Sequence, residues 1–314
     1  MSRRVIHKRD INRKVVLQER DLKILETLYY YRLLTTSQIK ELFFDSLKTA
    51  QTRMRKLYDI KLVSRIFRPT VFDNVDTIYI LANKAIDIVS KETGIETGKI
   101  LQVIKNGQRR TEFDHFLEMN NFRISLNISA TEYNNTISEL AKAGVKPEDI
   151  IKNEIFNWHY DDELRTVKGF RLVSEHVPDP EISGQTLTLA PDAFFGITSS
   201  KGKFLRYLEI DRGTMSNKAF YEKFKAYMSY VLSGGFKKKW EQFGYERFKV
   251  LIVSPPINTP GKKDIKDRIS LADKIDARFK GMFMFTENTF ITPKKILGQI
   301  WVSPDNLTFR CLHE

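Results

Sequence analysis

Three carboxylates lie near the ends of two short apolar segments of this 314-residue chain: Asp192, Glu209 and Asp211. Because side chains alternate along a strand, Glu209 and Asp211 are expected on one side, where they can approach Asp192 across a hairpin. Carboxylates that gather in one place repel each other unless a cation is present, and such hard ligands suit Mg²⁺ or Mn²⁺. The pattern predicts a divalent-metal site formed by these three residues. The alternative is a charged hairpin whose acids only discourage aggregation.

The same residues match part of the PD-(D/E)xK motif of restriction-endonuclease-like nucleases. Pro191 and Asp192 supply its first two residues, and Glu209 supplies the acid of the following strand. Asp211 stands where the motif has lysine, so a nuclease site here needs a cation from elsewhere.

The predicted helix at 216–232 offers that cation. Lys223 and Tyr227 are spaced i, i+4, so both can reach back over the strand that carries Glu209. Lys223 is our preferred candidate and Lys218 the alternative. A lysine there would stabilise the developing phosphate charge or help deprotonate water, while the metal polarises a phosphoryl oxygen. The competing interpretation is the solvated face of an amphipathic helix.

Periodicity predicts the elements that must position these residues. A helix at 111–128 precedes strands at 153–160, 187–198 and 204–211, and the helix at 216–232 precedes a buried strand at 248–255. The order helix, three strands, helix, strand is that of the restriction-endonuclease-like core. A further helix and strand are predicted at 262–279 and 282–287.

The positive charge of the chain is concentrated in its first third. Residues 1–110 contain 23 Lys+Arg and 12 Asp+Glu, a net +11, out of a net +13 for the whole chain. A phosphate-binding module joined to a nearly neutral domain would show this distribution. A basic surface kept for solubility is the alternative.

That basic third reads as three helices followed by a hairpin. Helices are predicted from Glu19, after a cap at Thr35-Thr36, and over 46–60 after a cap at Asp45-Ser46. Alternating β-branched and aromatic residues at 62–81 then predict two strands around a turn. The third helix is expected to face inward with Leu47, Ala50, Met54, Leu57 and Tyr58.

These elements predict a winged helix-turn-helix whose third helix enters the major groove of DNA. The polar face of that helix presents candidate DNA contacts, and the hairpin adds two arginines for phosphate. A winged helix that binds protein remains the alternative. The candidate DNA-binding residues are Lys48, Gln51, Thr52, Arg53, Arg55, Lys56, Arg65 and Arg68.

The predicted fold is α/β overall, of the α+β kind: an N-terminal winged helix-turn-helix, then a restriction-endonuclease-like domain with a mixed sheet. The predicted divisions are a basic arm at 1–18, the winged helix at 19–83, a helical linker at 84–110 and the nuclease-like domain at 111–314.

The chain resembles the replication-relaxation proteins of bacterial plasmids and mobile elements. The resemblance runs through RDLKILETLYYYRLLTTSQIKELFF, RMRKLYDIKLVSRIFRP, FDHFLEMNNFRISL, PDAFF, RYLEIDRGTMS and the KFKAY helix. It implies DNA binding by a winged helix and a divergent nuclease-like domain with a role in plasmid replication, relaxation or mobilisation. The family's acidic positions carry over to Asp192, Glu209 and Asp211 and its helix lysine to Lys223. His115 and Glu118 match the first helix of that domain as further candidate site residues.

The sequence lacks the residues that several classes of function require. No two histidines form the His-hydrophobe-His pair of two-histidine relaxases, and the segment Gly94–Lys99 is one residue short of a Walker A loop. The single cysteine, Cys311, excludes internal disulfides and fits a reducing compartment. No apolar run of membrane-spanning length appears, so we expect a cytoplasmic protein without a membrane partner.

We therefore expect a protein that binds double-stranded DNA and nicks it with Mg²⁺ or Mn²⁺. The alternative is a catalytically inactive replication initiator or transcription regulator on a nuclease-like scaffold. Replication or conjugation machinery are the expected protein partners. A homodimer is an open possibility that no heptad repeat supports.

Overall fold

The computed structural model describes residues 9–10, 14–66, 76–109, 113–143, 154–160, 175–199, 202–305, 307 and 309–312. The chain divides into two compact units, Met1–Asn120 and Asn121–Glu314. Both contain helices and β-sheet, which confirms the predicted α+β class.

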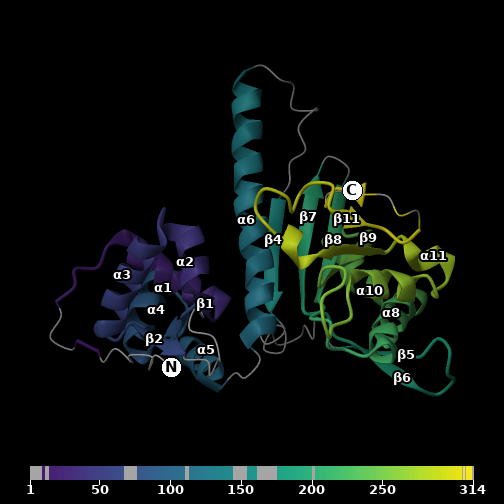
Figure 1. Ribbon diagram of the computed structural model, residues 1–314, viewed down its shortest axis with the longest axis horizontal. Helices are drawn as coiled ribbons and strands as arrows, with labels where there is room; N and C mark the ends of the chain where they lie inside the picture. The colour runs from purple at the N-terminus through teal and green to yellow at the C-terminus, as the bar shows by residue number, and fades with distance from the viewer. Residues whose placement is uncertain are drawn as a thin grey trace. The chain divides into compact units, whose positions relative to one another are not determined.

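The first unit begins with the helices α1, α2 and α3 and a small antiparallel sheet (Figure 1). Its strands are hydrogen-bonded in the order β1-β3-β2. The elements, in chain order, are α1 (Glu19–Tyr31), β1 (Leu34–Thr35), α2 (Thr36–Phe43), α3 (Leu47–Asp59), β2 (Val63–Ile66) and β3 (Ile78–Leu81).

Both predicted helix caps are present. The Thr35 side chain accepts a hydrogen bond from Gln38 N at the start of α2, and Ser46 accepts one from Thr49 N at the start of α3. Leu47 differs from its prediction, because its side chain is 43% exposed. It lies in the first turn of α3, ahead of the buried Ala50, Met54 and Leu57.

The segment predicted as a helical linker forms packed helices: η1 (Asn83–Ala85), α4 (Ile86–Thr93) and α5 (Thr97–Arg109). Val89, Ile100 and Ile104 are buried, and α4 contacts α1 while α5 contacts β3. These helices therefore add to the core of the first unit.

The start of α6 (Phe113–Lys142) also belongs to the first unit. The Asn120 amide donates to the carbonyls of Tyr31 (3.1 Å) and Leu33 (2.6 Å), and Gln38 Nε2 donates to Leu117 O at 3.0 Å. These bonds satisfy backbone oxygens in the connection after α1, and the division between units falls inside α6 rather than ahead of it.

The second unit is built on a mixed seven-stranded sheet with the order β12-β11-β10-β9-β8-β7-β4. Its β8-β9 and β9-β10 pairs are parallel, and the other pairs are antiparallel. The strands are β4 (Glu154–Tyr160), β7 (Ala193–Ser199), β8 (Gly202–Ile210), β9 (Arg247–Ser254), β10 (Phe283–Glu287), β11 (Trp301–Val302) and β12 (Phe309–Arg310).

Helices cover both faces of this sheet. On one face, the Phe224 ring of α8 (Asn217–Leu232) lies 4.7 Å from Phe283. On the other, the α6 ring of Phe122 lies 5.8 Å from Phe195 and 6.2 Å from Trp301. The remaining helices are α9 (Gly235–Trp240), η3 (Glu241–Phe243), α10 (Ile265–Ala272), α11 (Ala277–Lys280) and η4 (Asn288–Phe290).

Two predicted elements are divided in the structure. The strand predicted at 187–198 contributes to two sheets, because β6 (Thr186–Leu189) pairs with β5 (Glu175–Pro178) and β7 begins only after Pro191. Proline has no N–H to donate to a ladder, and here the chain changes partner. The helix predicted at 262–279 stops at Ala272, and the Asp276 side chain caps the separate α11.

Within the described part of the chain, no helix combines the length and apolar character that crossing a membrane requires.

Candidate functional site

Glu209 lies near the end of β8, on the face of the sheet covered by α8. The neighbouring odd-numbered residues Leu205 and Tyr207 belong to the core that α8 completes. Tyr227 OH donates to Glu209 Oε1 at 2.7 Å, and Lys223 Nζ forms an ion pair with Glu209 Oε2. The structure thus brings both i, i+4 residues of α8 to the strand acid, as their spacing suggested.

Asp192 reaches the same place from the preceding strand. Its backbone N–H donates to Leu208 O at 3.0 Å, and its carboxylate accepts a bond from Ile210 N at 2.7 Å. Asp192 is therefore fixed beside the residue that follows Glu209. We call Asp192, Glu209, Lys223 and Tyr227 the carboxylate site.

Burial and charge act in opposite directions on the Glu209 carboxyl. Burial raises its pKa, the charge of Lys223 lowers it, and the charge of Asp192 raises it again, with a net raised value. Burial alone would lower the pKa of Lys223, but the carboxylates of Glu209 and Asp192 raise it above its usual value. Lys223 therefore remains a cation, and its side chain is still 28% exposed, against 4% for Glu209.

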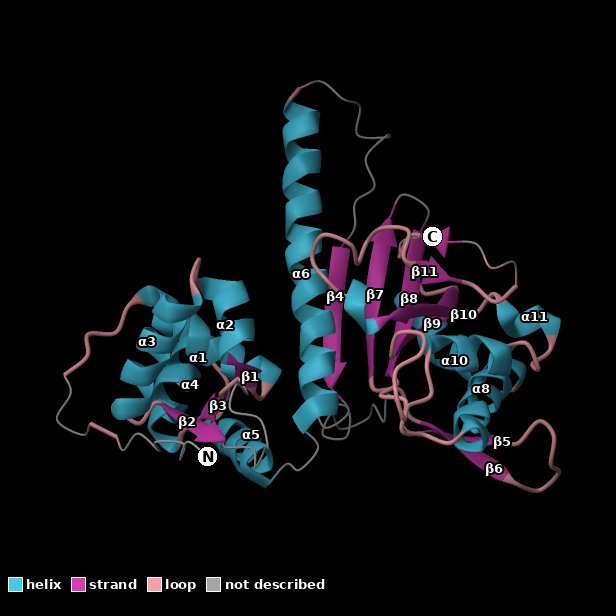
Figure 2. Cartoon of the chain, in the orientation of Figure 1, coloured by secondary structure: helices cyan, strands magenta, loops and turns pink. Residues whose placement is uncertain are grey.

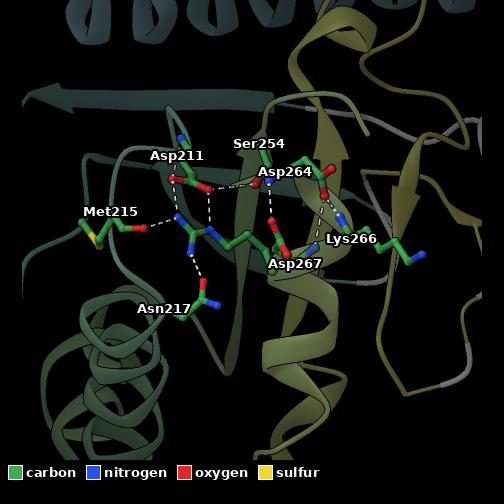
Figure 3. Close-up of polar contacts among 9 residues, drawn as sticks. Asp211, Met215, Asn217, Ser254, Asp264, Lys266 and Asp267 are labelled. Atoms are coloured by element: carbon green, nitrogen blue, oxygen red, sulfur yellow. Dashed lines mark hydrogen bonds and ion pairs between the residues drawn. The ribbon is translucent and has the colours of Figure 1, made fainter. Parts of the chain in front are cut away.

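Asp211 is held by a different cation, Arg268 of α10. Arg268 Nε and Nη2 donate to its two carboxylate oxygens at 2.6 and 3.1 Å, and Gly213 N donates at 2.9 Å (Figure 3). Ser254 Oγ adds a longer bond of 3.4 Å. Asp211 was predicted as a metal ligand, whereas in the structure both of its carboxylate oxygens belong to a buried ion pair.

Arg268 itself is completely buried and was not identified from the sequence. Its guanidinium also donates to Asn217 Oδ1 (3.0 Å) and Met215 O (2.9 Å), and it lies 4.2 Å from the Phe220 ring centroid. These contacts join α10 to the turn between β8 and α8. No local pattern relates Arg268 to an aspartate 57 residues away, so only the fold identifies the pair.

Asp192 and Glu209 are the residues that fit a divalent cation. Mg²⁺ is often bound by one or two carboxylates together with waters and substrate phosphate, so this pair is a suitable donor set. The described residues include no group of three or more His, Cys, Asp or Glu side chains placed to hold a metal ion.

The remaining candidate site residues are Lys218, His115 and Glu118. Lys218 is exposed on α8, and Lys223 is the lysine that contacts Glu209. His115 and Glu118 are half-buried at the start of α6 and belong to the first unit, whereas the carboxylate site belongs to the second.

The predicted DNA-binding face of α3 is partly exposed. Lys48, Gln51 and Thr52 are exposed, but Arg53 is engaged within the protein. Arg53 Nε donates to Asp21 Oδ1 at 2.6 Å, and Arg53 Nη2 donates to Val16 O at 2.9 Å. Asp21 is completely buried, so this contact fixes α3 to α1.

The remaining basic candidates have protein neighbours or lie outside the description. Arg55 pairs with the buried Asp59 at 2.9 Å, and Arg65 lies 4.4 Å from the Tyr58 ring centroid. Lys56 is half-buried. Arg68 falls outside the described residues.

Comparison with known proteins places the chain in a family. The model of the family described as "Replication-relaxation" matches residues 25–244, which span α1 to the end of η3 and include Asp192, Glu209, Asp211 and Lys223. No curated protein matches the sequence. Since the match covers well over half of the chain, the protein belongs to the replication-relaxation family.

Proposed function

We propose that this protein binds double-stranded DNA and nicks it with Mg²⁺ or Mn²⁺ at the carboxylate site, in replication-related processing of plasmid or mobile-element DNA. The observation that carries the proposal is the convergence of two acids and a lysine from three elements. Asp192 directly precedes β7, Glu209 is the second-last residue of β8, and Lys223 reaches Glu209 from α8. The family description supports the role in replication.

The order of elements supports the nuclease assignment. In the second unit, helix α6 is followed by strands β4, β7 and β8, helix α8 and the parallel strand β9. That order, apart from the added β5-β6 hairpin, is the one expected of a restriction-endonuclease-like core. A fold by itself does not define an activity, so the argument rests on the acids and the lysine.

The first unit supports the DNA-binding part. Its order of three helices and three strands, with β3 between β1 and β2, agrees with a winged helix-turn-helix. In our proposal the exposed Lys48, Gln51 and Thr52 of α3 enter the major groove, and Arg55 is left out because it pairs with the buried Asp59. Arg53 is left out because it already pairs with Asp21.

Each residue of the carboxylate site has a proposed part in cleavage. A bound Mg²⁺ or Mn²⁺ would polarise a phosphoryl oxygen and activate water. Asp192 and Glu209 would hold it, and Tyr227 would keep the Glu209 carboxylate oriented. Lys223 would stabilise negative charge that develops on the phosphate. Asp211 is left out of the metal ligands because the completely buried Arg268 occupies both of its oxygens, whereas the Lys223 side chain beside Glu209 is 28% exposed.

The test is conversion of supercoiled plasmid carrying the element's own origin to open-circle DNA with Mg²⁺ or Mn²⁺. Asp192→Ala, Glu209→Ala and Lys223→Ala should abolish nicking at equal DNA occupancy. The matched controls Asp273→Ala and Lys218→Ala should cut like wild type, since they remove the same charges from exposed positions. Equal nicking by wild type and the three site variants would refute the assignment.

A second candidate function is a non-catalytic replication factor on the same fold. It is favoured by the Asp211-Arg268 pair, which removes one acid from the predicted metal group. DNA binding by wild type and all variants without any nicking would establish this second function.

A further inference from the structure

A short loop after β9 lies directly beside the strand that carries Glu209. It covers residues 255–263 and ends at Lys262 and Lys263, which we call the loop lysines. Lys263 N donates to Gly213 O at 3.0 Å, so the end of the loop pairs with the turn that follows β8. Because β8 and β9 are parallel, their carboxyl ends share one edge of the sheet, which is where open α/β sheets bind ligands.

Gly213 makes this close approach sterically possible. Its φ is +70°, and a Cβ added there would lie 2.4 Å from Lys263 O and 2.8 Å from Lys262 Cβ. Any larger residue would push the loop away from the turn. Gly213 lies four residues along the chain from Glu209, a span of at most about 14 Å, and the loop lysines pack directly on it.

The loop backbone is fixed by its own hydrogen bonds. Thr259 Oγ1 donates to Pro256 O at 2.6 Å, and Lys262 N donates to Thr259 O at 3.3 Å. The Asp264 carboxylate accepts from Asn258 N at 2.8 Å and caps α10 by accepting from Lys266 N (Figure 3). The Arg268-Asp211 pair then fastens α10 to the same turn. Binding at this loop would require little ordering of the backbone.

The charges at the end of the loop are not neutralised. Both loop lysines are exposed, and neither forms an ion pair with any of the described residues. The nearest acid in sequence, Asp264, uses its oxygens to accept backbone N–H groups. A rigid loop with two free ammonium groups suits a polyanion better than a single small anion.

We propose that Lys262 and Lys263 bind backbone phosphates of the DNA strand that enters the carboxylate site. This inference rests on the proposed function and identifies how the second unit would hold its substrate. One DNA strand rises about 3.4 Å per nucleotide, so lysines packed on Gly213, which lies at most about 14 Å from Glu209, would contact phosphates a few nucleotides from the scissile one. The turn at Gly213 and the Arg268-Asp211 pair position the loop.

The test measures DNA affinity of the full-length protein against salt concentration, with EDTA present so that no cleavage occurs. The probe is a labelled duplex containing the origin, and Lys262→Ala/Lys263→Ala is compared with wild type. Loss of two phosphate contacts should lower the affinity and make the slope of log K against log salt shallower by about 1.8, since each contact contributes about 0.9. Lys262→Arg/Lys263→Arg should retain the affinity and the salt slope of wild type.

The matched control is Lys237→Ala/Lys238→Ala on α9, which removes the same charge from exposed residues that follow the far end of α8. It should bind like wild type. An unchanged slope in the loop variant, or an equal loss in the α9 variant, would overturn the proposal. Absence of nicking in wild type, with the loop variant still weakened, would instead refute only the cleavage reaction. A wild type that binds no duplex would refute DNA binding and this inference together.

Discussion

Glu209 in β8 and Asp211 just after it are both buried, but they pair with different cations. The two ion pairs therefore differ in whether they can take part in catalysis. Arg268 is completely buried and clamps both oxygens of Asp211, so that pair is closed to substrate. Lys223 is partly exposed beside Glu209, so its charge can reach an incoming phosphate. We therefore assign a structural role to the Asp211-Arg268 pair and a catalytic role to the Glu209-Lys223 pair.

Breaking the closed pair should strongly destabilise the protein. Arg268→Met leaves the Asp211 carboxylate buried without its cation, which should lower the free energy of unfolding by about 3–5 kcal/mol. Urea denaturation measures this loss. The double variant Asp211→Asn/Arg268→Met should be less destabilised, because no buried charge is left unpaired. Lys280→Met, which breaks the exposed pair with Asp273, should cost at most about 1 kcal/mol. A small effect of Arg268→Met would contradict the structural assignment.

Two basic residues of α3 should respond differently to substitution. Lys48→Ala removes an exposed charge, so it should reduce the salt slope of duplex binding by about 0.9 without changing thermal stability. Arg53→Ala leaves the buried Asp21 unpaired, so it should lower the melting temperature. Fluorescence anisotropy and thermal denaturation separate the two effects, and an unchanged melting temperature for Arg53→Ala would contradict its structural role.

At the scale of elements, the turn after β8 places the loop lysines. Gly213→Ala should cost about 1–2 kcal/mol for its left-handed backbone and more because the new methyl would meet Lys263 O. Gly234→Ala is the matched control, since its φ of +72° is similar and nothing lies within 4 Å of its Cβ position. The free energy of unfolding should fall clearly more for Gly213→Ala than for Gly234→Ala. Equal losses would mean that the loop does not pack on this turn.

The β5-β6 hairpin is held against α8 by charge (Figure 2). Lys225 Nζ donates to Asp179 Oδ2 at 2.7 Å, and Lys239 forms an ion pair with Glu175. The hydrogen bond from Lys225 is the main cause that lowers the pKa of Asp179, and a hydrogen bond from Glu181 N lowers it further. Because β6 ends three residues before Asp192, anchoring this hairpin also restrains the segment that leads to Asp192.

The lowered pKa of Asp179 predicts a dependence on acid. Its contribution to stability is present above the unfolded value, about pH 3.9, and is lost as the pH falls through the lower folded value. Asp179→Asn should therefore melt below wild type at neutral pH, and the gap should narrow as the pH falls below about 4. Thermal denaturation from pH 7 to 3 measures the gap, and a gap independent of pH would contradict the ion pair.

At the scale of the whole molecule, the charge is divided unevenly between the regions proposed to bind and to cut DNA. The first unit, residues 1–120, holds a net +8, whereas the longer second unit, residues 121–314, holds a net +5. The larger share of the electrostatic affinity for DNA should therefore come from the first unit, and the loop lysines should add phosphate contacts in the second.

Binding and cleavage should consequently be separable. Glu209→Gln should abolish nicking while duplex affinity in EDTA stays equal or rises slightly, because the substitution removes a negative charge near the phosphates. Anisotropy and plasmid nicking on the same preparation measure both, with Asp273→Asn as the exposed control. A large loss of affinity in Glu209→Gln would show that the site carries the binding itself.

Features that depend on neighbours along the chain could be predicted before the fold was known. Helix caps at Thr35 and Ser46, the amphipathic period of α3 and the i, i+4 pair Lys223 and Tyr227 all follow from spacing, because cap bonds and side-chain faces are local. The order of the main elements from α6 to β10 and the family were also accessible from the sequence, whereas β5, α9, β11 and β12 were not predicted.

Tertiary structure alone decided which charges meet and which remain free. Arg268 takes Asp211 from 57 residues away, and Asp21 takes Arg53 from 32 residues away. One strand ladder ends at Leu189 and another begins at Ala193, with Pro191 between them, and periodicity cannot separate these two strands from one continuous strand. A buried charge must find a partner wherever the fold places one, so its partner depends on distances in space that local sequence does not encode.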